Sequence, residues 1–212
     1  MADKIALTID GKYIVADEET SVLEAALKNG VYIPHLCYHP DLKPIGACRL
    51  CFVELGDGQI VPSCLLPVGQ GMVVRTKSAE IDKLRRAIAE LLIADHHTNC
   101  RDCSKSGNCE LQRIMAYLHI SVKRMRPLRW AKEELLRDTS NPFFDYDPNR
   151  CVLCGICVRT CEEIQGVSAL YFVGRGYGTK IAFFGDKSRY ESCGECVVRC
   201  PVGALISKNA RQ

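Results

Sequence analysis

The sequence lacks the features of a membrane-spanning or exported chain. None of its apolar runs approaches the roughly 18 residues that a membrane-spanning helix needs. The opening segment, MADKIALTID, has no basic stretch followed by an apolar one, so it does not indicate a secretory signal. We therefore expect a cytoplasmic protein without a membrane span.

Charge of one sign is also scarce. The chain has 28 Lys and Arg against 25 Asp and Glu, which gives a formal net charge of +3. Such a small excess is weak support for nucleic-acid binding. Metal-bound thiols are deprotonated, so with cluster irons and thiolates both counted we expect the metal-bound protein to be net negative by a few charges. We expect no nucleic-acid partner.

Cysteine, in contrast, is abundant, with 14 residues among 212. In an exported chain this number would suggest disulfides, but cytosolic thiols stay reduced. Reduced thiols in such numbers are typical of metal ligands. Their spacing divides them into four groups, which leave no cysteine over.

The N-terminal third has the pattern of a small α+β domain that ends near Lys77. Residues 5–16 predict two strands around an Asp10-Gly11 turn. Residues 19–30 predict a short helix, and LCFVEL and QIVPSCLL predict further strands after it.

Beyond this domain the pattern becomes helical and then irregular. Residues 78–97 predict a helix whose core face consists of Ile81, Leu84, Ile88, Leu91 and Leu92. A second helix is predicted after Cys109, and residues 119–146 are predicted to be a linker. The segment ALYFVGRGYGTKIAFFG predicts a hairpin, and its GRGYG lacks the order of a nucleotide-binding fingerprint.

The first group of cysteines has a C-x2-C pair with a single cysteine on each side. Iron binds soft thiolates, and a [2Fe–2S] cluster takes four of them. A four-cysteine zinc site is the alternative, because zinc sites also use C-x2-C. The group consists of Cys37, Cys48, Cys51 and Cys64.

The second group has the spacing H-x3-C-x2-C-x5-C. Three cysteines and one histidine form a common structural zinc set, so the spacing leaves zinc and an iron–sulfur cluster equally open. The neighbouring His97 could take the place of His96. The group consists of His96, Cys100, Cys103 and Cys109.

The third and fourth groups come from the pseudo-repeats CGICVRTC and CGECVVRC. In the ferredoxin run C-x2-C-x2-C-x3-C the fourth cysteine binds the other cluster. That crossing gives one [4Fe–4S] set of Cys151, Cys154, Cys157 and Cys200. The second set has Cys161, Cys193 and Cys196, with Tyr190 at the vacant ligand position.

With the four groups placed, nearly the whole chain resembles the N-terminal iron–sulfur region of the large subunit of respiratory complex I. The same array occurs in [FeFe]-hydrogenases, in NAD-dependent formate dehydrogenases and in the small diaphorase subunit of NAD-reducing hydrogenases. The resemblance rests on IPHLCYHPDLKPIGACRLCFVEL, HHTNCRDCSKSGNCELQ, NPFFDYDPNRCVLCGICVRTCEEIQGVSALYFVGRGY and CGECVVRCPVGAL.

The resemblance implies an α+β protein with three domains. These are a β-grasp [2Fe–2S] ferredoxin domain over 1–77, a small helical domain over 78–118 and, after a linker over 119–146, a two-cluster bacterial ferredoxin-like domain over 147–212. The middle domain would hold a [4Fe–4S] cluster through one histidine and three cysteines. The family pattern favours His96 as that histidine.

The resemblance further implies an electron-transfer subunit of a multi-subunit NAD(P)-linked oxidoreductase. A hydrogenase is the favoured kind of complex. The subunit's partners would be a flavin- and NAD(P)-binding diaphorase subunit and a catalytic subunit. A formate dehydrogenase subunit is one alternative, and a non-redox zinc-binding interaction module is another. Because the sequence ends soon after Cys200, we expect no substrate-transforming site in this chain.

Tyr190 departs from the family pattern, which has a ligand at this position. Three buried thiols without a metal would be an unusual set, so we expect a cluster at Cys161, Cys193 and Cys196. It could be [4Fe–4S], with an oxygen ligand from Tyr190, from nearby Asp186 or from water, or it could be [3Fe–4S]. The expected cofactors are thus one [2Fe–2S] cluster, two [4Fe–4S] clusters and this further cluster.

Overall fold

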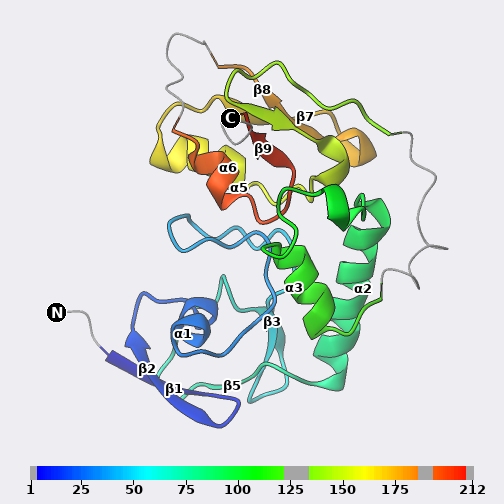
Figure 1. Cartoon of the computed structure of the whole chain (residues 1–212). Coiled ribbons are helices and arrows are strands. Elements are labelled where there is room, and N and C mark those ends of the chain that lie inside the picture. Colours follow the sequence, from blue (N-terminus) through cyan, green and yellow to red (C-terminus); the bar gives the residue numbers. More distant parts are fainter. Residues whose placement is uncertain (1–3, 122–133, 186–192, 209–212) are drawn as a thin grey trace. The chain divides into compact units, whose positions relative to one another are not determined.

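A computed structural model describes residues 4–121, 134–185 and 193–208 (Figure 1). The chain divides into two compact units. The first unit comprises Met1–Glu90 with Tyr117–Ile120, and the second comprises Leu91–Ala116 with Ser121–Gln212. Within the described residues no helix is both long and apolar enough to cross a bilayer.

The first unit contains a mixed five-stranded sheet with the order β2-β1-β5-β3-β4. Strand β1 pairs in parallel with β5, whereas its pairing with β2 and the pairings of β3 with β4 and β5 are antiparallel. The elements are β1 (Lys4–Ile9), β2 (Lys12–Asp17), α1 (Val22–Lys28), β3 (Phe52–Leu55), β4 (Ile60–Pro62) and β5 (Val73–Arg75).

The predicted N-terminal hairpin and helix are confirmed. Ile9 pairs with Lys12 across a two-residue turn in which Asp10 and Gly11 both have positive φ, at 50° and 79°. Such a turn matches the twist of the flanking strands. Ser21 caps α1 by accepting a hydrogen bond of 3.2 Å from the amide of Glu24.

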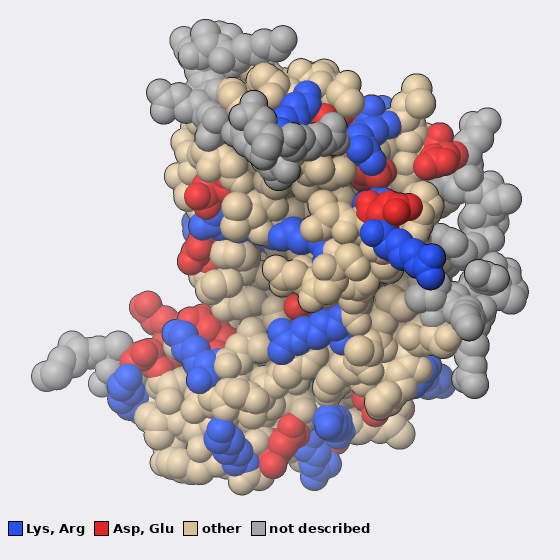
Figure 2. Space-filling model, in the orientation of Figure 1, with Lys and Arg blue, Asp and Glu red and all other residues tan. Residues whose placement is uncertain are grey.

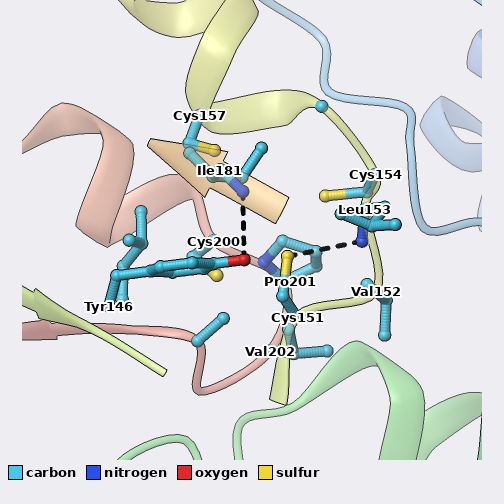
Figure 3. A pocket seen from close by; sticks show the side chains of 13 residues that line it. Tyr146, Cys151, Val152, Leu153, Cys154, Cys157, Ile181, Cys200, Pro201 and Val202 are labelled. Atoms are coloured by element: carbon cyan, nitrogen blue, oxygen red, sulfur yellow. Dashed lines mark hydrogen bonds between the residues drawn. The ribbon is translucent and has the colours of Figure 1, made fainter. Parts of the chain in front are cut away.

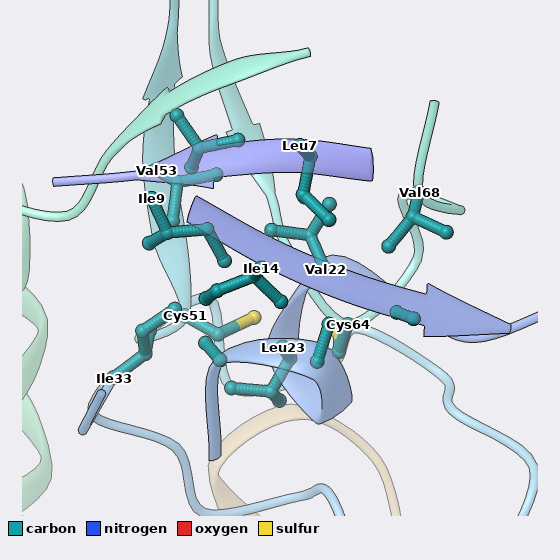
Figure 4. Packing of buried hydrophobic residues seen from close by; sticks show 14 of the residues in the cluster. Leu7, Ile9, Ile14, Val22, Leu23, Ile33, Cys51, Val53, Cys64 and Val68 are labelled. Carbon is teal, nitrogen blue, oxygen red and sulfur yellow. The ribbon is translucent and has the colours of Figure 1, made fainter. Parts of the chain in front are cut away.

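The core of the first unit consists of aliphatic side chains from the sheet and α1 (Figure 4). Leu7, Ile9 and Ile14 alternate with more exposed residues along β1 and β2, as a half-buried sheet requires. Cys51 and Cys64 lie in the same cluster, each with 1% of its surface exposed. Two predicted metal ligands therefore sit in a conventional hydrophobic core.

Helix α2 (Ala79–Asp95) forms where it is predicted, but the predicted core face is wrong in part. Leu91 is 73% exposed and Leu84 36%, whereas Arg85 is completely buried. The buried stripe follows the four-residue repeat Ile81, Arg85, Ala89 and Ile93. Arg85 can occupy this stripe because main-chain carbonyls accept hydrogen bonds from its guanidinium group.

Helix α3 (Glu110–Tyr117) also forms as predicted, and the last three residues of the predicted linker over 119–146 form a strand, β6. Residues 122–133 lie outside the described part of the chain. β6 (Phe144–Tyr146) pairs antiparallel with β9 (Leu205–Ser207). A strand of three residues that pairs with a partner so distant in sequence has no local signature.

The remainder of the second unit is built from short elements. β7 (Leu170–Val173) and β8 (Lys180–Phe183) form the predicted hairpin, with GRGYG in its turn. Two short helices follow left-handed glycines: α5 (Ile156–Arg159) after Gly155 and α6 (Glu195–Arg199) after Gly194. On the face drawn in Figure 2, basic and acidic side chains are interspersed.

Candidate metal centres

The first cysteine group lies in the first unit, around the loop that precedes β3. Amide groups of this loop point at thiol sulfurs: the Leu36 amide donates to Cys48 Sγ at 3.4 Å, and the Cys48 amide donates to Cys37 Sγ at 3.3 Å. Backbone hydrogen bonds to sulfur are typical of iron–sulfur sites, where they stabilise thiolate charge.

The four thiols of this group interact as two hydrogen-bonded pairs. The hydrogen bond from Cys37 lowers the pKa of Cys48 to about 5, and the bond from Cys64 lowers the pKa of Cys51 to about 7. The donors Cys37 and Cys64 accordingly have raised pKa values. The structure thus brings all four predicted ligands together, and two of them favour the thiolate form that binds metal.

Two polar side chains hold the same loop by hydrogen bonds to its main chain. The sequence patterns did not predict this role for either of them. The Ser63 hydroxyl donates to the Cys51 carbonyl at 2.7 Å. The Arg85 guanidinium donates to the carbonyls of Leu50 at 3.1 Å and Phe52 at 2.5 Å. Cys51 is therefore held through its own carbonyl and through both neighbouring residues.

The second group lies at the end of α2 and the start of α3. Burial raises the pKa of Cys109, while the amides of Gln112 and Leu111 donate to its sulfur and oppose that shift. Cys100 and Cys103 are close enough to act on Cys109 electrostatically. The three thiols therefore gather at the N-terminus of α3, where free amides favour negative charge.

The two candidate histidines of this group have different surroundings. His96 is 8% exposed and counts among the buried residues. His97 is more exposed, and its amide donates to the Asn149 carbonyl at 2.8 Å. The buried position suits a residue that faces a cluster, which agrees with the choice of His96.

The third group lines a pocket in the second unit, shown in Figure 3. The space between its walls is about 350 Å³, part of it open to solvent. The four thiols share the pocket with mainly apolar side chains and with Tyr146. The four are Cys151, Cys154, Cys157 and Cys200, the set predicted from cross-ligation between the two cysteine runs.

Burial in this pocket favours the neutral form of two of the four thiols. Burial raises the pKa of Cys154 and of Cys157 well above the ordinary thiol value. The Leu153 amide donates to Cys151 Sγ at 3.4 Å. Tyr146 hydrogen-bonds to Cys151 and accepts the Ile181 amide at 3.2 Å. Four convergent thiols in an apolar wall fit an iron–sulfur cluster by donor chemistry.

The fourth group is described only in part, because Tyr190 and Asp186 lie outside the described residues. Cys161 and Cys196 are buried, whereas Cys193 is exposed. The Ala169 amide donates to Cys161 Sγ at 3.1 Å, as amides do in the other groups. Among the described residues, no three His, Cys, Asp or Glu side chains lie close enough together to bind one metal ion.

Three family models match the chain in succession. A 2Fe-2S iron-sulfur cluster binding domain matches residues 2–79. The NADH-ubiquinone oxidoreductase-G iron-sulfur binding region matches 85–124, and the ferredoxin-like domain of NADH-quinone oxidoreductase subunit 3 matches 141–206. These ranges contain, in order, the first group, the second group, and the third and fourth groups together.

Individual proteins match over nearly the whole chain. The NADPH-Fe(3+) oxidoreductase subunit alpha of Geobacter sulfurreducens is 38% identical over 206 residues, or 96% of this chain and 24% of that protein. The mitochondrial NADH-ubiquinone oxidoreductase 78 kDa subunit of Neurospora crassa is 36% identical over 209 residues, or 97% of this chain and 28% of that protein.

One solved structure matches most of both chains. A chain in the crystal structure of NAD+-reducing [NiFe]-hydrogenase in the H2-reduced state matches with a TM-score of 0.84 and 36% identity, over 97% of this chain and 88% of that chain. This chain belongs to the same iron–sulfur family. The predicted family is confirmed, and with it the presence of 2Fe–2S and 4Fe–4S binding domains.

The match with the curated relatives covers only part of their length. The chain spans about a quarter of them, 24% of the Geobacter protein and 28% of the Neurospora protein. The region shared with these relatives is the one that contains the four cysteine groups.

Proposed function

We propose that this chain is an electron-transfer subunit that relays electrons between a flavin- and NAD(P)-binding diaphorase subunit and a catalytic subunit. A hydrogenase is the favoured complex, because the matching crystal structure belongs to an NAD+-reducing [NiFe]-hydrogenase. When bound, iron–sulfur clusters accept and donate single electrons. The chain's own residues bind them, space them and shield them from water.

The proposed ligand sets follow the four groups. Cys37, Cys48, Cys51 and Cys64 would hold a [2Fe–2S] cluster in a β-grasp domain. Two [4Fe–4S] clusters would be held by His96, Cys100, Cys103 and Cys109 and by Cys151, Cys154, Cys157 and Cys200. Cys161, Cys193 and Cys196 would hold a further [4Fe–4S] or [3Fe–4S] cluster beside Tyr190. The domain limits at 77, 118 and 146 remain predictions.

A single hydrogen bond carries the proposal that electrons pass along the chain. The Glu110 amide donates to the Pro201 carbonyl at 2.9 Å. Glu110 follows the ligand Cys109, and Pro201 follows the ligand Cys200. Two candidate cluster sites of the second unit are therefore joined by one hydrogen bond and two peptide units, a short connection of the kind that electron transfer needs.

A second contact joins the same two sites. A Cβ atom placed on Gly203 would lie 2.4 Å from Cys103 Sγ, so the glycine backbone is in close contact with that sulfur. Only glycine permits such an approach without displacing one side.

Anaerobic purification under native conditions tests the proposal. We expect a brown protein with labile sulfide, separate EPR signals for [2Fe–2S] and [4Fe–4S] clusters on reduction, and co-purification with larger redox subunits. A molybdenum-containing partner would favour the formate dehydrogenase alternative over hydrogenase. A colourless protein with zinc and no sulfide would support the zinc-binding module and reject the electron-transfer function.

A further inference from the structure

Arg85 is a charged side chain buried in the core of the first unit. None of its surface is exposed, and among the residues that the structure describes it is the largest fully buried side chain. Arginine is almost never fully buried without a charged partner, because taking a guanidinium ion out of water is costly. Burial lowers the pKa of Arg85, but an arginine remains protonated at neutral pH. The core therefore contains a permanent positive charge.

Arg85 donates hydrogen bonds to three main-chain carbonyls, two of which flank one proposed cluster ligand. Its Nε and Nη2 atoms donate to the carbonyls of Leu50 and Phe52, at 3.1 and 2.5 Å. Its Nη1 atom donates to the Thr76 carbonyl at 2.8 Å. Leu50 and Phe52 are the two neighbours of Cys51 in the sequence. The guanidinium group therefore holds the main chain by hydrogen bonds on both sides of this cysteine.

These carbonyls satisfy the N–H groups of Arg85 but do not neutralise its charge. The side chain of Tyr117 also interacts with Arg85, but a phenol group is not a counter-ion. Asp82 lies one turn earlier on α2 and attracts Arg85, but it is exposed, so water screens the attraction. Cys51 also acts on Arg85 electrostatically as a thiolate. A buried cation at the segment that carries Cys51 is best compensated by negative charge on that cysteine and on the group that it binds.

We propose that Arg85 is the buried counter-charge of the [2Fe–2S] cluster and that it raises the reduction potential of that cluster. The inference rests on the proposed ligand set of Cys37, Cys48, Cys51 and Cys64. A cluster with four thiolates is negative, and reduction adds one more negative charge. A fixed cation nearby stabilises the reduced form more than the oxidised form, because the attraction grows with the charge. Arg85 is thus a positioning residue that acts through Cys51.

Substitution of Arg85 with the uncharged Met tests the role of the charge. The readout is the midpoint potential of the [2Fe–2S] EPR signal in a redox titration of the complete holoprotein. We expect Arg85→Met to shift the ratio of reduced to oxidised cluster at least about tenfold toward the oxidised form. For a one-electron couple that is a fall of ~59 mV. The potentials of the clusters in the second unit should not move.

The chain supplies a matched control in the next residue. Arg86 lies on the same helix and donates to the Leu118 carbonyl at 2.8 Å, but it is exposed. Arg86→Met should leave the [2Fe–2S] potential within about twofold of the wild-type ratio, because an exposed charge is screened by solvent. An equal fall in both variants would contradict a special role for the buried charge.

Arg85→Gln separates charge from hydrogen bonding. Glutamine keeps an amide group that can donate to these carbonyls but carries no charge, whereas a buried lysine would readily lose its proton. We expect the same fall in potential as in Arg85→Met. A wild-type potential in Arg85→Gln would overturn the charge role, and this test still holds if Arg85→Met fails to assemble. A wild-type potential in cluster-containing Arg85→Met would overturn the inference alone. If the wild-type protein showed no [2Fe–2S] signal, the proposed ligand set would fall as well.

Discussion

The two units place their cysteines in contrasting surroundings. In the first unit, Cys51 and Cys64 are part of a continuous aliphatic core beneath a five-stranded sheet. In the second unit, the sheets have two strands each, and the buried set includes many polar groups. These groups are His96, Asn141, Asp145, Asp147, Asn149, Arg150, Arg159 and Thr160.

The contrast indicates what each unit depends on for its stability. Burial of apolar surface stabilises the first unit whether or not a cluster is present, at about 25 cal/mol per Å². The second unit offers less apolar surface to bury, and two-stranded sheets are marginal by themselves. We therefore expect bound clusters to supply much of the stability of this unit, as metals do in other small domains.

Removal of the clusters should therefore have the largest effect, and it should affect the units unequally. After anaerobic chelation, we expect hydrogen–deuterium exchange to lose protection at β7 and β8 by several orders of magnitude. Protection at β1 and β2 should fall far less, because the aliphatic core remains. Equal loss of protection in both hairpins would show that the first unit also depends on its cluster.

Loss of a single ligand should abolish one cluster. Such a variant tests whether each cluster takes ligands from both cysteine runs. We expect Cys200→Ala to abolish the [4Fe–4S] signal of the pocket that also contains Cys151, Cys154 and Cys157. Cys161→Ala should leave that signal in place, although Cys161 belongs to the same run as those three. EPR and iron content distinguish the two variants. Loss of the same signal in both would favour ligation within each run.

Much of this architecture could be predicted from local sequence signals. The Asp10-Gly11 turn, the Ser21 cap and the cysteine spacings each act over a few residues, so the pattern alone identifies them. Arg85 could not be identified in this way. Its burial depends on the carbonyls of Leu50, Phe52 and Thr76, which the fold of the sheet brings to it.

The second unit contains a parallel case in β6. Phe144–Tyr146 becomes a strand only because Leu205–Ser207 lies beside it, and the intervening segment gives no sign of that pairing. Tyr146 reaches the third cysteine group through this strand. Sequence patterns thus revealed the thiols, but not the side chains that adjust their surroundings.

Substitution of Gly203 should have an intermediate effect, limited to the second unit. Gly203→Ala would place its Cβ 2.4 Å from Cys103 Sγ. Overpacking of this kind costs about 1–3 kcal/mol, so we expect a lower thermal midpoint and a disturbed EPR signal from the His96 group. Gly178→Ala is the matched control, because a Cβ at that position meets no atom within 4 Å. Similar losses in both variants would show that the Cys103 contact is not responsible.

The smallest effect is expected from Tyr146→Phe, which removes one hydroxyl and leaves the ring in place. The Tyr146 hydroxyl hydrogen-bonds to Cys151 and accepts the Ile181 amide, so its loss leaves one amide without its partner and one sulfur with less support. A hydrogen bond to a thiolate stabilises the reduced cluster, and a bond of this kind contributes about 1 kcal/mol.

We therefore expect Tyr146→Phe to lower the reduction potential of the third-group cluster. At a fixed solution potential, the ratio of reduced to oxidised cluster should fall several fold. The [2Fe–2S] potential in the first unit should stay unchanged. Tyr177→Phe is the control, because the Tyr177 hydroxyl is bonded to Asp95 at 3.0 Å and its side chain is exposed. An unchanged potential in Tyr146→Phe would mean that the pocket sets its potential through burial and main-chain amides alone. The second unit would then differ from the first, where we propose that a side chain sets the potential.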